Sequence, residues 1–253
     1  MRVVFLGTGT SQGVPVIACP CKVCSSDNPH DKRLRSSILI EDGETVVVID
    51  SGPDFRQQML LNGVKRLSAL VFTHDHKDHI AGMDDIRAFN FVNRSAVDVF
   101  ASVEVQESLK REFPYVFEDL KYPGVPEINM HTIYEESFSI GGLNFLPLPV
   151  LHYRLPVNGY RVGDFSYITD ANHIPDETMR KLSGTRVLVI NALRHEKHIS
   201  HFNLEEALAI IEKVNPEQAY LTHISHQLGR QMEIDSMLPT NVKCSFDGLE
   251  LSI

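Results

Sequence analysis

The chain has 253 residues, of which 43% are hydrophobic and 23% are charged, and its formal net charge is −9. These proportions are typical of a folded globular protein with a sizeable core, and they argue against disorder. The acidic balance opposes binding to polyanions, because non-specific nucleic-acid affinity depends on lysine and arginine. No apolar run approaches the roughly 20 residues of a membrane helix, and the chain starts directly in a strand-like segment, so we expect a cytoplasmic protein.

Short apolar runs rich in valine and isoleucine predict strands in both halves of the chain. In the first half these runs cover residues 2–7, 37–40, 45–50 and 69–73. In the second half they lie within 143–152, 159–170 and 185–191. Asp42-Gly43 separates two runs of the first set and predicts a hairpin, because this dipeptide tolerates positive φ.

Helical periodicity predicts helices between and after these strands. We place them at about 53–62, 79–90, 103–111, 175–182 and 203–214. Pro53 and Pro175 suit a first helical turn, and Asn203 is expected to be an N-cap. No low-complexity linker or short repeat divides the chain, so we expect one α/β domain over residues 1–253.

The segment THDHKDH, residues 73–79, concentrates histidine and aspartate directly after an apolar strand. In an extended segment His74 and His76 face the same point, while Asp78 and His79 can face a neighbouring one. Imidazole and carboxylate are ligands of Zn, Mn and Fe, and two-metal hydrolytic sites hold their ions about 3.5–4 Å apart. A solvated polar loop is the alternative, but the pattern H-x-H-x-D-H after a strand is specific and favours two metal sites.

Further ligands have to come from elsewhere in the chain. His152, Asp170 and His223 each end an apolar strand in the same way as the first cluster. Taken singly, such residues are more often structural or exposed. Taken with the first cluster, they complete two metal sites that share one carboxylate.

The chain resembles the metallo-β-lactamase superfamily from VVFLGTGTSQG to YLTHISH, and THDHKDH is the most specific part of the likeness. The resemblance implies a four-layer αβ/βα sandwich of two mixed sheets with helices on the outer faces. It further implies two ligand sets, which are His74, His76 and His152 for one ion and Asp78, His79 and His223 for the other. Asp170 would bridge the two ions.

Asp50, at the end of TVVVID, matches an aspartate that orients a ligand histidine in this superfamily. A turn-starting aspartate without a role at the metals is the alternative.

A second motif, CPCKVC, brings Cys19, Cys21 and Cys24 close together in the chain. Three thiolates at this spacing can converge on one zinc ion, which needs a fourth ligand, and His226 is the best candidate. Reduced, packed cysteines or a local disulfide are the alternatives, and Cys244 is expected to be a lone core thiol. The chain is similar here to the phosphoribosyl cyclic phosphate phosphodiesterases of phosphonate degradation. That likeness implies a structural zinc that tethers the N-terminal loop beside the active site.

Two more residues are candidates for contact with substrate. His201, before FNLEEA, matches a histidine that the resemblance places over the cleft, where it would steady phosphoryl oxygens or protonate a leaving alkoxide. Capping of the following helix is the alternative. Arg87, in GMDDIRAFN, either contacts a substrate phosphate or pairs with Asp84 or Asp85 at the surface. Asp78 counts as a catalytic residue as well as a ligand.

These features predict a metal-dependent hydrolase that cleaves a small phosphodiester through a hydroxide bridging two ions. A phosphoribosyl cyclic phosphate or a 2′,3′-cyclic nucleotide is the expected substrate type. The expected cofactors are two active-site ions, Zn or Mn with Fe as a third option, and one structural Zn. We expect a small phosphorylated substrate and neither a membrane nor a nucleic-acid partner, and a homodimer stays open.

Three other functions remain alternatives. A tRNA 3′-processing endonuclease shares the ligands, but the acidic balance opposes it. A glyoxalase-type thioester hydrolase would require a C-terminal extension that the sequence does not match. A non-hydrolytic binding protein of pyrroloquinoline quinone biosynthesis shares the fold and the cysteine trio.

Overall fold

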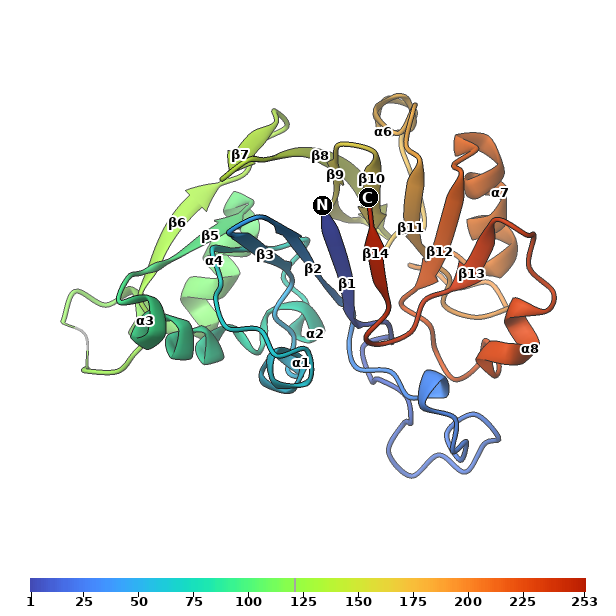
Figure 1. Cartoon of the computed structure of the whole chain (residues 1–253), viewed down its shortest axis with the longest axis horizontal. Coiled ribbons are helices and arrows are strands. Elements are labelled where there is room, and N and C mark those ends of the chain that lie inside the picture. The colour runs from blue at the N-terminus through green and yellow to red at the C-terminus, as the bar shows by residue number, and fades with distance from the viewer. Residues whose placement is uncertain (121) are drawn as a thin grey trace.

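The computed structural model describes residues 1–120 and 122–253. Two seven-stranded sheets face each other, and helices lie on the outer side of each sheet (Figure 1). The predicted four-layer αβ/βα sandwich with two mixed sheets is confirmed. Within the described residues, no helix combines the length and the apolar character that crossing a membrane requires.

The first sheet has the order β14-β1-β2-β3-β4-β5-β6, antiparallel from β14 to β3 and parallel from β3 to β6. Its strands are β1 (Arg2–Gly7), β2 (Ser37–Asp42), β3 (Thr45–Ile49), β4 (Ala69–Val71), β5 (Val97–Ala101), β6 (Ile128–Thr132) and β14 (Glu250–Ser252).

The second sheet has the order β13-β12-β11-β10-β9-β8-β7, parallel from β13 to β10 and antiparallel from β10 to β7. Its strands are β7 (Phe138–Ile140), β8 (Leu143–His152), β9 (Leu155–Val162), β10 (Phe165–Ile168), β11 (Val187–Asn191), β12 (Gln218–Thr222) and β13 (Val242–Cys244).

The helices fall into two groups, one for each sheet. Those of the first half are α1 (Phe55–Leu61), α2 (Lys77–Ile80), α3 (Arg87–Asn93), α4 (Val103–Glu112) and α5 (Pro114–Phe117), with short 3₁₀ turns η1 (Pro29–Asp31) and η2 (Met83–Ile86). Those of the second half are α6 (Asp176–Lys181), α7 (Leu204–Val214) and α8 (Gln231–Asp235).

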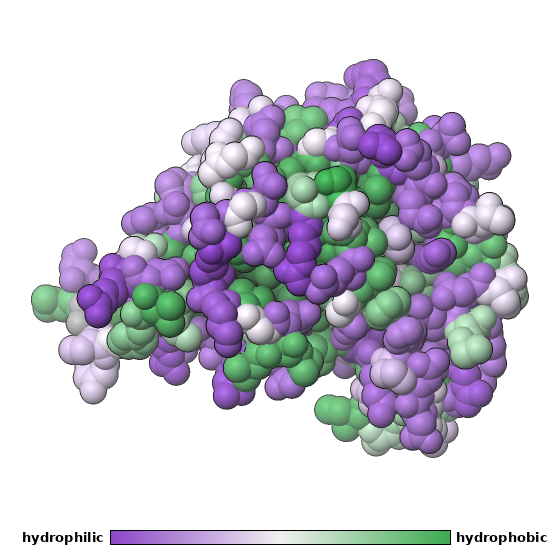
Figure 2. Space-filling model, viewed as in Figure 1, coloured by the Kyte–Doolittle hydropathy of each residue, from purple (hydrophilic) through white to green (hydrophobic). Residues whose placement is uncertain are grey.

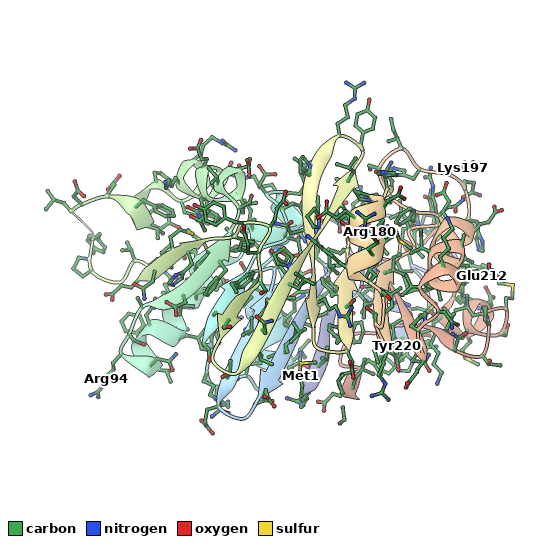
Figure 3. The ribbon with its side chains drawn as sticks, turned by 90° about the horizontal axis from the view of Figure 1, so that it is seen from above. Met1, Arg94, Arg180, Lys197, Glu212 and Tyr220 are labelled. Carbon is green, nitrogen blue, oxygen red and sulfur yellow. The ribbon has the colours of Figure 1, made fainter. Side chains whose placement is uncertain are left out.

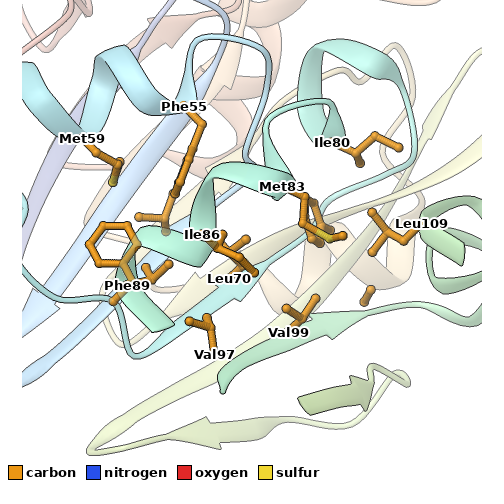
Figure 4. Packing of buried hydrophobic residues seen from close by; sticks show 14 of the residues in the cluster. Phe55, Met59, Leu70, Ile80, Met83, Ile86, Phe89, Val97, Val99 and Leu109 are labelled. Atoms are coloured by element: carbon orange, nitrogen blue, oxygen red, sulfur yellow. The ribbon is translucent and has the colours of Figure 1, made fainter. Parts of the chain in front are cut away.

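Three apolar clusters hold the four layers together. One lies between the first sheet and its helices, where Phe55, Met83 and Leu109 meet strand residues such as Val99 (Figure 4). A second lies between the two sheets, and the third lies beneath the helices of the second half. The face of the molecule drawn in Figure 2 is mostly polar, with apolar residues in separate small groups. Burial of apolar surface between layers is therefore the main source of stability.

Several local predictions agree with the structure. The predicted hairpin is present, but its two-residue turn is Gly43-Glu44, because Asp42 still belongs to β2 and pairs with Thr45; Gly43 has φ +57°. Asn203 caps α7 through a capping box, because its side chain accepts from the Glu206 N–H at 2.8 Å and the Glu206 carboxylate accepts from the Asn203 N–H at 3.0 Å. Pro53 lies before α1, which begins at Phe55, so it precedes the helix rather than filling its first turn.

The single helix predicted over residues 79–90 is wrong, because this stretch contains the end of α2, then η2, then α3. Gly82 marks the break, and its N–H donates to the Ser51 carbonyl at 2.8 Å instead of continuing a helix. A Cβ at Gly82 would lie 2.1 Å from the Gly52 carbonyl oxygen, and a Cβ at Gly52 would lie 2.0 Å from the Asp78 carbonyl oxygen. Two glycines thus let the turn after β3 pack directly against α2.

We predict that Gly82→Ala lowers the free energy of unfolding by about 1–3 kcal/mol or more, because the new methyl group would overlap backbone that cannot move aside. Chemical denaturation of the two purified proteins measures this difference. Gly142→Ala is the matched control, since no atom lies within 4 Å of its added Cβ. Equal midpoints for the parent and Gly82→Ala would contradict the close approach.

Candidate metal centre

The candidate ligands lie at one edge of the two sheets because of strand direction. His152 ends β8, Asp170 follows β10 and His223 follows β12. These three strands run in the same direction. Both β8 and β10 are antiparallel to β9, and the strands β10, β11 and β12 are parallel to one another. The segment His74–His79 follows β4 of the first sheet and is joined to this edge by the Asn158 N–H, which donates to the Thr73 carbonyl at 3.1 Å.

Four side chains form the tighter group: Asp78, His79, Asp170 and His223 each offer a ligand atom within 4.8 Å of the others. His79 Nε2 lies 3.2 Å from Asp78 Oδ2 and 3.4 Å from Asp170 Oδ1. His223 Nδ1 lies 3.0 Å from the same oxygen of Asp170. The group combines two carboxylates with two imidazoles, a donor set suited to a divalent ion.

The other three histidines lie next to one another, and the ring of His74 also lies 4.2 Å from that of His79. Ring centroids are 4.6 Å apart for His74 and His76, 5.0 Å for His76 and His152, and 5.8 Å for His74 and His152. His74 Nε2 lies 3.9 Å from Asp170 Oδ2, whereas His79 and His223 approach Oδ1. Asp170 Oδ2 therefore faces His74, whereas Oδ1 faces His79 and His223, and the rings of His74 and His79 are 4.2 Å apart.

Buried nitrogen atoms without partners test whether this donor set fits metal ions. His74 Nε2 and His79 Nε2 are buried and have no hydrogen-bond partner among the described residues. A buried polar atom without a partner costs about 1–3 kcal/mol, and coordination to a metal removes that cost. Both nitrogens point at Asp170, where an ion would lie. The residues present fit a pair of divalent ions.

The protonation of the imidazoles reflects the same burial. Desolvation lowers the pKa of His74 well below its usual value and also lowers that of His223, so both are neutral, which is the ligand form. Burial lowers the pKa of His79 too, but the carboxylates of Asp170, Asp78 and Asp50 outweigh it and raise this pKa well above its usual value. His79 therefore lies among the three carboxylates that carry the negative charge of the site.

Outer hydrogen bonds fix the orientation of the rings. Asp50 is fully buried, and its Oδ2 lies 2.7 Å from His79 Nδ1 while it accepts from the Thr73 hydroxyl at 2.8 Å. This contact leaves His79 Nε2 facing Asp170, which is the orienting role that the sequence analysis assigns to Asp50. His152 Nδ1 donates to the Ser200 carbonyl at 2.7 Å. Sequence reasoning missed Thr73 and Ser200, because a hydroxyl or main-chain partner leaves no pattern in the sequence.

His201 is buried at the same centre, with its ring 4.4 Å from that of His152 and 4.8 Å from that of His223. Burial lowers its pKa to about 2, so the ring is neutral. Together with His152 and Asp170 it offers a ligand atom within 4.8 Å of the others. The structure thus places His201 close enough either to touch a substrate or to join the ligands.

The cysteine motif forms a separate cluster. Cys19, Cys21, Cys24 and His226 each offer a ligand atom within 4.8 Å of the others, and all three thiols are free. His226 Nδ1 lies 3.4 Å from Cys19 Sγ and 3.3 Å from Cys21 Sγ. The Cys24 N–H donates to Cys21 Sγ at 3.4 Å, and this bond is the main reason that the Cys21 pKa falls to about 6. Cys244 is a buried thiol on β13, outside this cluster.

Arg87 forms the surface ion pair with Asp84 that was one of its two alternatives in the sequence analysis. Its guanidinium lies 3.5 Å from the Asp84 carboxylate, and its side chain is about half exposed. Asp84 also accepts from the Tyr115 hydroxyl at 2.6 Å. The contacts of Arg87 therefore explain its position without a substrate phosphate.

Comparison with known proteins places the chain in a family. Residues 45–224 match the family described as "Beta-lactamase superfamily domain". An octanoyltransferase of Porphyromonas gingivalis is 38% identical over the whole chain, but the chain spans only 52% of that relative. A crystal structure described as a new diphosphatase from the PhnP family is 39% identical, with a TM-score of 0.94 and coverage of 100% of this chain and 97% of the other.

Zn²⁺-bound PqqB from Methylobacterium extorquens shares the fold at a TM-score of 0.82 and 19% identity, with both chains fully covered. At that identity the likeness concerns the fold alone. The family match covers most of the chain, and the likeness to the diphosphatase extends over all of it. The chain therefore belongs to the metallo-β-lactamase superfamily, in its PhnP-like branch.

Proposed function

We propose that the chain is a phosphodiesterase that acts on a small phosphorylated substrate, with cyclic phosphates as the preferred class. The position of Asp170 carries this proposal, because imidazoles approach both of its oxygens, His74 at Oδ2 and His79 and His223 at Oδ1. By the family resemblance, one ion would be held by His74, His76 and His152 and the other by Asp78, His79 and His223. The second set is grouped with Asp170 in the structure, where His152 is grouped with Asp170 and His201. Bound ions of this kind supply a nucleophile at neutral pH and offset charge on phosphoryl oxygens.

His201 is proposed to contact the substrate. Its ring lies between those of His152 and His223, and its Nδ1 is buried with no hydrogen-bond partner among the described residues. Hydrolysis adds a hydroxyl group to phosphorus and a proton to the leaving oxygen. A ring at this position can hydrogen-bond a phosphoryl oxygen or assist the leaving oxygen, and the two roles differ in their dependence on the leaving group.

The surroundings of the centre favour a small substrate over a long polyanion. A cavity of about 580 Å³ adjoins His74, which is within the usual range for small-molecule sites. Asp75, Glu104, Glu135 and Glu136 line it, and no lysine or arginine is among its described lining residues. The acidic lining would repel a tRNA more strongly than a small substrate, because the repulsion grows with the number of phosphates, so we favour the small substrate.

Cleavage of a diphosphate is the second candidate, because the relative of the PhnP family with 39% identity is described as a diphosphatase. Both reactions displace an oxygen from phosphorus and need the same stabilisation of charge. The octanoyltransferase name belongs to a protein about twice as long as this chain. Ser36 does contact His223, but the same Nδ1 atom faces Asp170, whereas a Ser-His-Asp relay uses both ring nitrogens.

The proposed function predicts hydrolysis of bis(p-nitrophenyl) phosphate and of a 2′,3′-cyclic nucleotide by the protein loaded with Mn²⁺ or Zn²⁺. Chelation should abolish both activities, since the residues alone provide no comparable nucleophile. Assays with a nucleoside diphosphate and an octanoyl thioester run in parallel. Faster cleavage of the diphosphate would favour the second candidate, and cleavage of the thioester alone would contradict both. A protein that binds the metal ions but cleaves none of these substrates would favour the non-hydrolytic binding protein of pyrroloquinoline quinone biosynthesis.

The two clusters predict three metal equivalents per chain, two at Asp170 and one zinc at the cysteines. Elemental analysis should give about two equivalents for Asp78→Ala, which removes a ligand of one active-site ion. Cys21→Ser should lose the zinc instead and melt at least about 5 °C lower, because binding of a structural zinc is coupled to folding.

Cys244→Ala controls for loss of a thiol outside the cluster and should retain all three ions. A Cys21→Ser protein that keeps its zinc and its melting temperature would rule out the structural site. Fewer than three equivalents in a reconstituted parent that keeps its cysteine-bound zinc would rule out the paired centre.

His201→Ala should lower kcat by about 10²–10⁴-fold for a phosphodiester with an alkoxide leaving group, if the ring assists departure of that group. The loss should be much smaller for p-nitrophenolate, which leaves without a proton. Steady-state kinetics on the two esters measures the difference. His195→Ala, an exposed residue of the same loop, is the control. Equal losses on both esters would assign His201 to phosphoryl contact, and loss of an ion would assign it to the ligands.

A further inference from the structure

Strand direction places the cavity of about 580 Å³ directly beside the metal centre. Strands β4, β5 and β6 are parallel to one another, so their carboxyl ends meet at one edge of the first sheet. Residues 73–75 come after β4, residues 102–105 follow β5 and residues 133–136 follow β6, and all three segments line the cavity. Leu155 and Val157 of β9 close it from the second sheet. The cavity therefore leads away from the candidate ligands along this edge.

His74 forms the end of the cavity nearest the ions. Its side chain is 1% exposed, and its Nε2 has no hydrogen-bond partner among the described residues. A buried nitrogen left without a partner at a cavity wall indicates that a bound group completes it. With a metal ion and the reacting phosphate at this end, the remaining volume is left for the non-reacting part of a substrate.

Carboxylates are the charged groups of this cavity. Four acidic residues line it, which are Asp75, Glu104, Glu135 and Glu136, and no lysine or arginine is among its described lining residues. Asp75 is held in place, because its Oδ2 accepts from the buried Ser108 hydroxyl at 2.5 Å. Apolar walls such as those formed by Leu155 and Val157 concentrate the field of charges that share one sign. The cavity therefore attracts a positively charged group.

The start of α4 does not make this cavity a second phosphate site. The first turn of a helix favours an anion in general, because its N–H groups are free and its dipole is positive there. Here Ser102 is the N-cap, and its side chain accepts from the Val105 N–H at 3.4 Å. Glu104 adds a carboxylate to the same turn. An acidic side chain thus already occupies the position that favours an anion.

The spacing of the carboxylates favours an organic cation over a metal ion. Among the described residues, the groups with three or more ligand atoms within 4.8 Å of one another include none of these four carboxylates. A divalent ion needs several oxygens at about 2.0–2.6 Å, so a wider ring of carboxylates suits a larger cation. Tyr134 also lines the cavity, and its side chain is 68% exposed, so the ring is open to a ligand. Aromatic faces and carboxylates together are suited to ammonium groups.

We propose that this cavity binds an ammonium group carried by the non-reacting part of the substrate. The inference rests on the proposed function, since it assumes that the reacting phosphate lies at the metal ions. The carboxylates and the Tyr134 ring would surround the charge, while Leu155 and Val157 contact the carbon atoms next to it. The substrate class is thus a small phosphodiester with an alkylammonium group a few bonds from phosphorus.

Two chromogenic phosphodiesters of nearly the same shape test this assignment. One is p-nitrophenyl phosphocholine, and the other is p-nitrophenyl 3,3-dimethylbutyl phosphate, in which a carbon atom replaces the charged nitrogen. Both release p-nitrophenolate when water adds to phosphorus, so they differ in the charge of the non-reacting part. The parent loaded with Mn²⁺ should cleave the choline ester with a kcat/KM at least about tenfold higher. Equal values, or a preference for the neutral ester, would overturn the inference.

Glu104→Gln/Glu135→Gln removes two of the carboxylates and keeps the volume of both side chains. The preference for the choline ester should fall below about threefold, because the attraction depends on charge. Glu127→Gln/Glu212→Gln is the matched control, since both residues are exposed and neither lines the cavity. Figure 3 shows Glu212 on α7, at the opposite end of the view from the green helices of the first half. A control that loses the preference equally, or a cavity variant that keeps it, would contradict the assignment.

Substitutions of Tyr134 test the aromatic contact. Tyr134→Phe should keep the preference for the choline ester, whereas Tyr134→Leu should lower it by about two- to fivefold, because a cation–π contact needs the face of a ring and no hydroxyl group. Both variants should melt with the parent, since the Tyr134 side chain lies at the surface. An equal preference in these two variants would overturn the role of the ring.

A binding measurement keeps the test independent of turnover. Calorimetry on the metal-loaded parent should show phosphocholine binding at least about tenfold more tightly than 3,3-dimethylbutyl phosphate, and Glu104→Gln/Glu135→Gln should remove most of this difference. A parent that cleaves neither ester nor bis(p-nitrophenyl) phosphate contradicts the proposed function, and calorimetry then still decides the role of the cavity. A parent that binds the two phosphates equally, or binds neither, overturns the inference.

Discussion

Charge buried at Asp170 is the constraint on which the rest of this structure depends. A carboxylate that is 1% exposed is stable only if positive charge or hydrogen-bond donors surround it, and here neighbouring imidazoles approach both of its oxygens. The imidazoles come from both sheets, so neither half of the chain can build the site alone. The face-to-face packing of two sheets is therefore a requirement of the chemistry as well as a source of core burial.

Close backbone contact supplies the precision that this arrangement needs. Gly52 and Gly82 allow the turn after β3 to approach α2 without a side chain between them, and the Ser51 N–H then donates to the His79 carbonyl at 2.8 Å. Asp50 lies in the same turn and contacts the ring of His79. One short segment thus fixes both the main chain and the side chain of a candidate ligand, His79, as outer contacts do in metal sites.

The sequence predicted the fold because apolar strands, a hairpin dipeptide and a helix cap are local signals. It also indicated which polar residues meet, since Asp170 and His223 end strands whose carboxyl ends share one edge. It could not predict the break at Gly82, because that break depends on contact with Gly52, which is 30 residues away in the chain. Short strands such as β13 were not predicted for a related reason. Only the pairing of β13 with β12 defines it as a strand.

The pairing of β1 with β14 has a consequence for how this chain can be combined with others. Met1 and Ile253 are hydrogen-bonded to each other, so both termini lie together at one end of β1 (Figure 1). The other end of β1 leads into Gly9, which bridges to Ile224 next to the metal centre. A strand of this length separates the two ends by about 20 Å. A module joined at either terminus would therefore lie across the sheet from the edge that carries the candidate metal centre. Fusion to another domain, or circular permutation, would leave that edge uncovered.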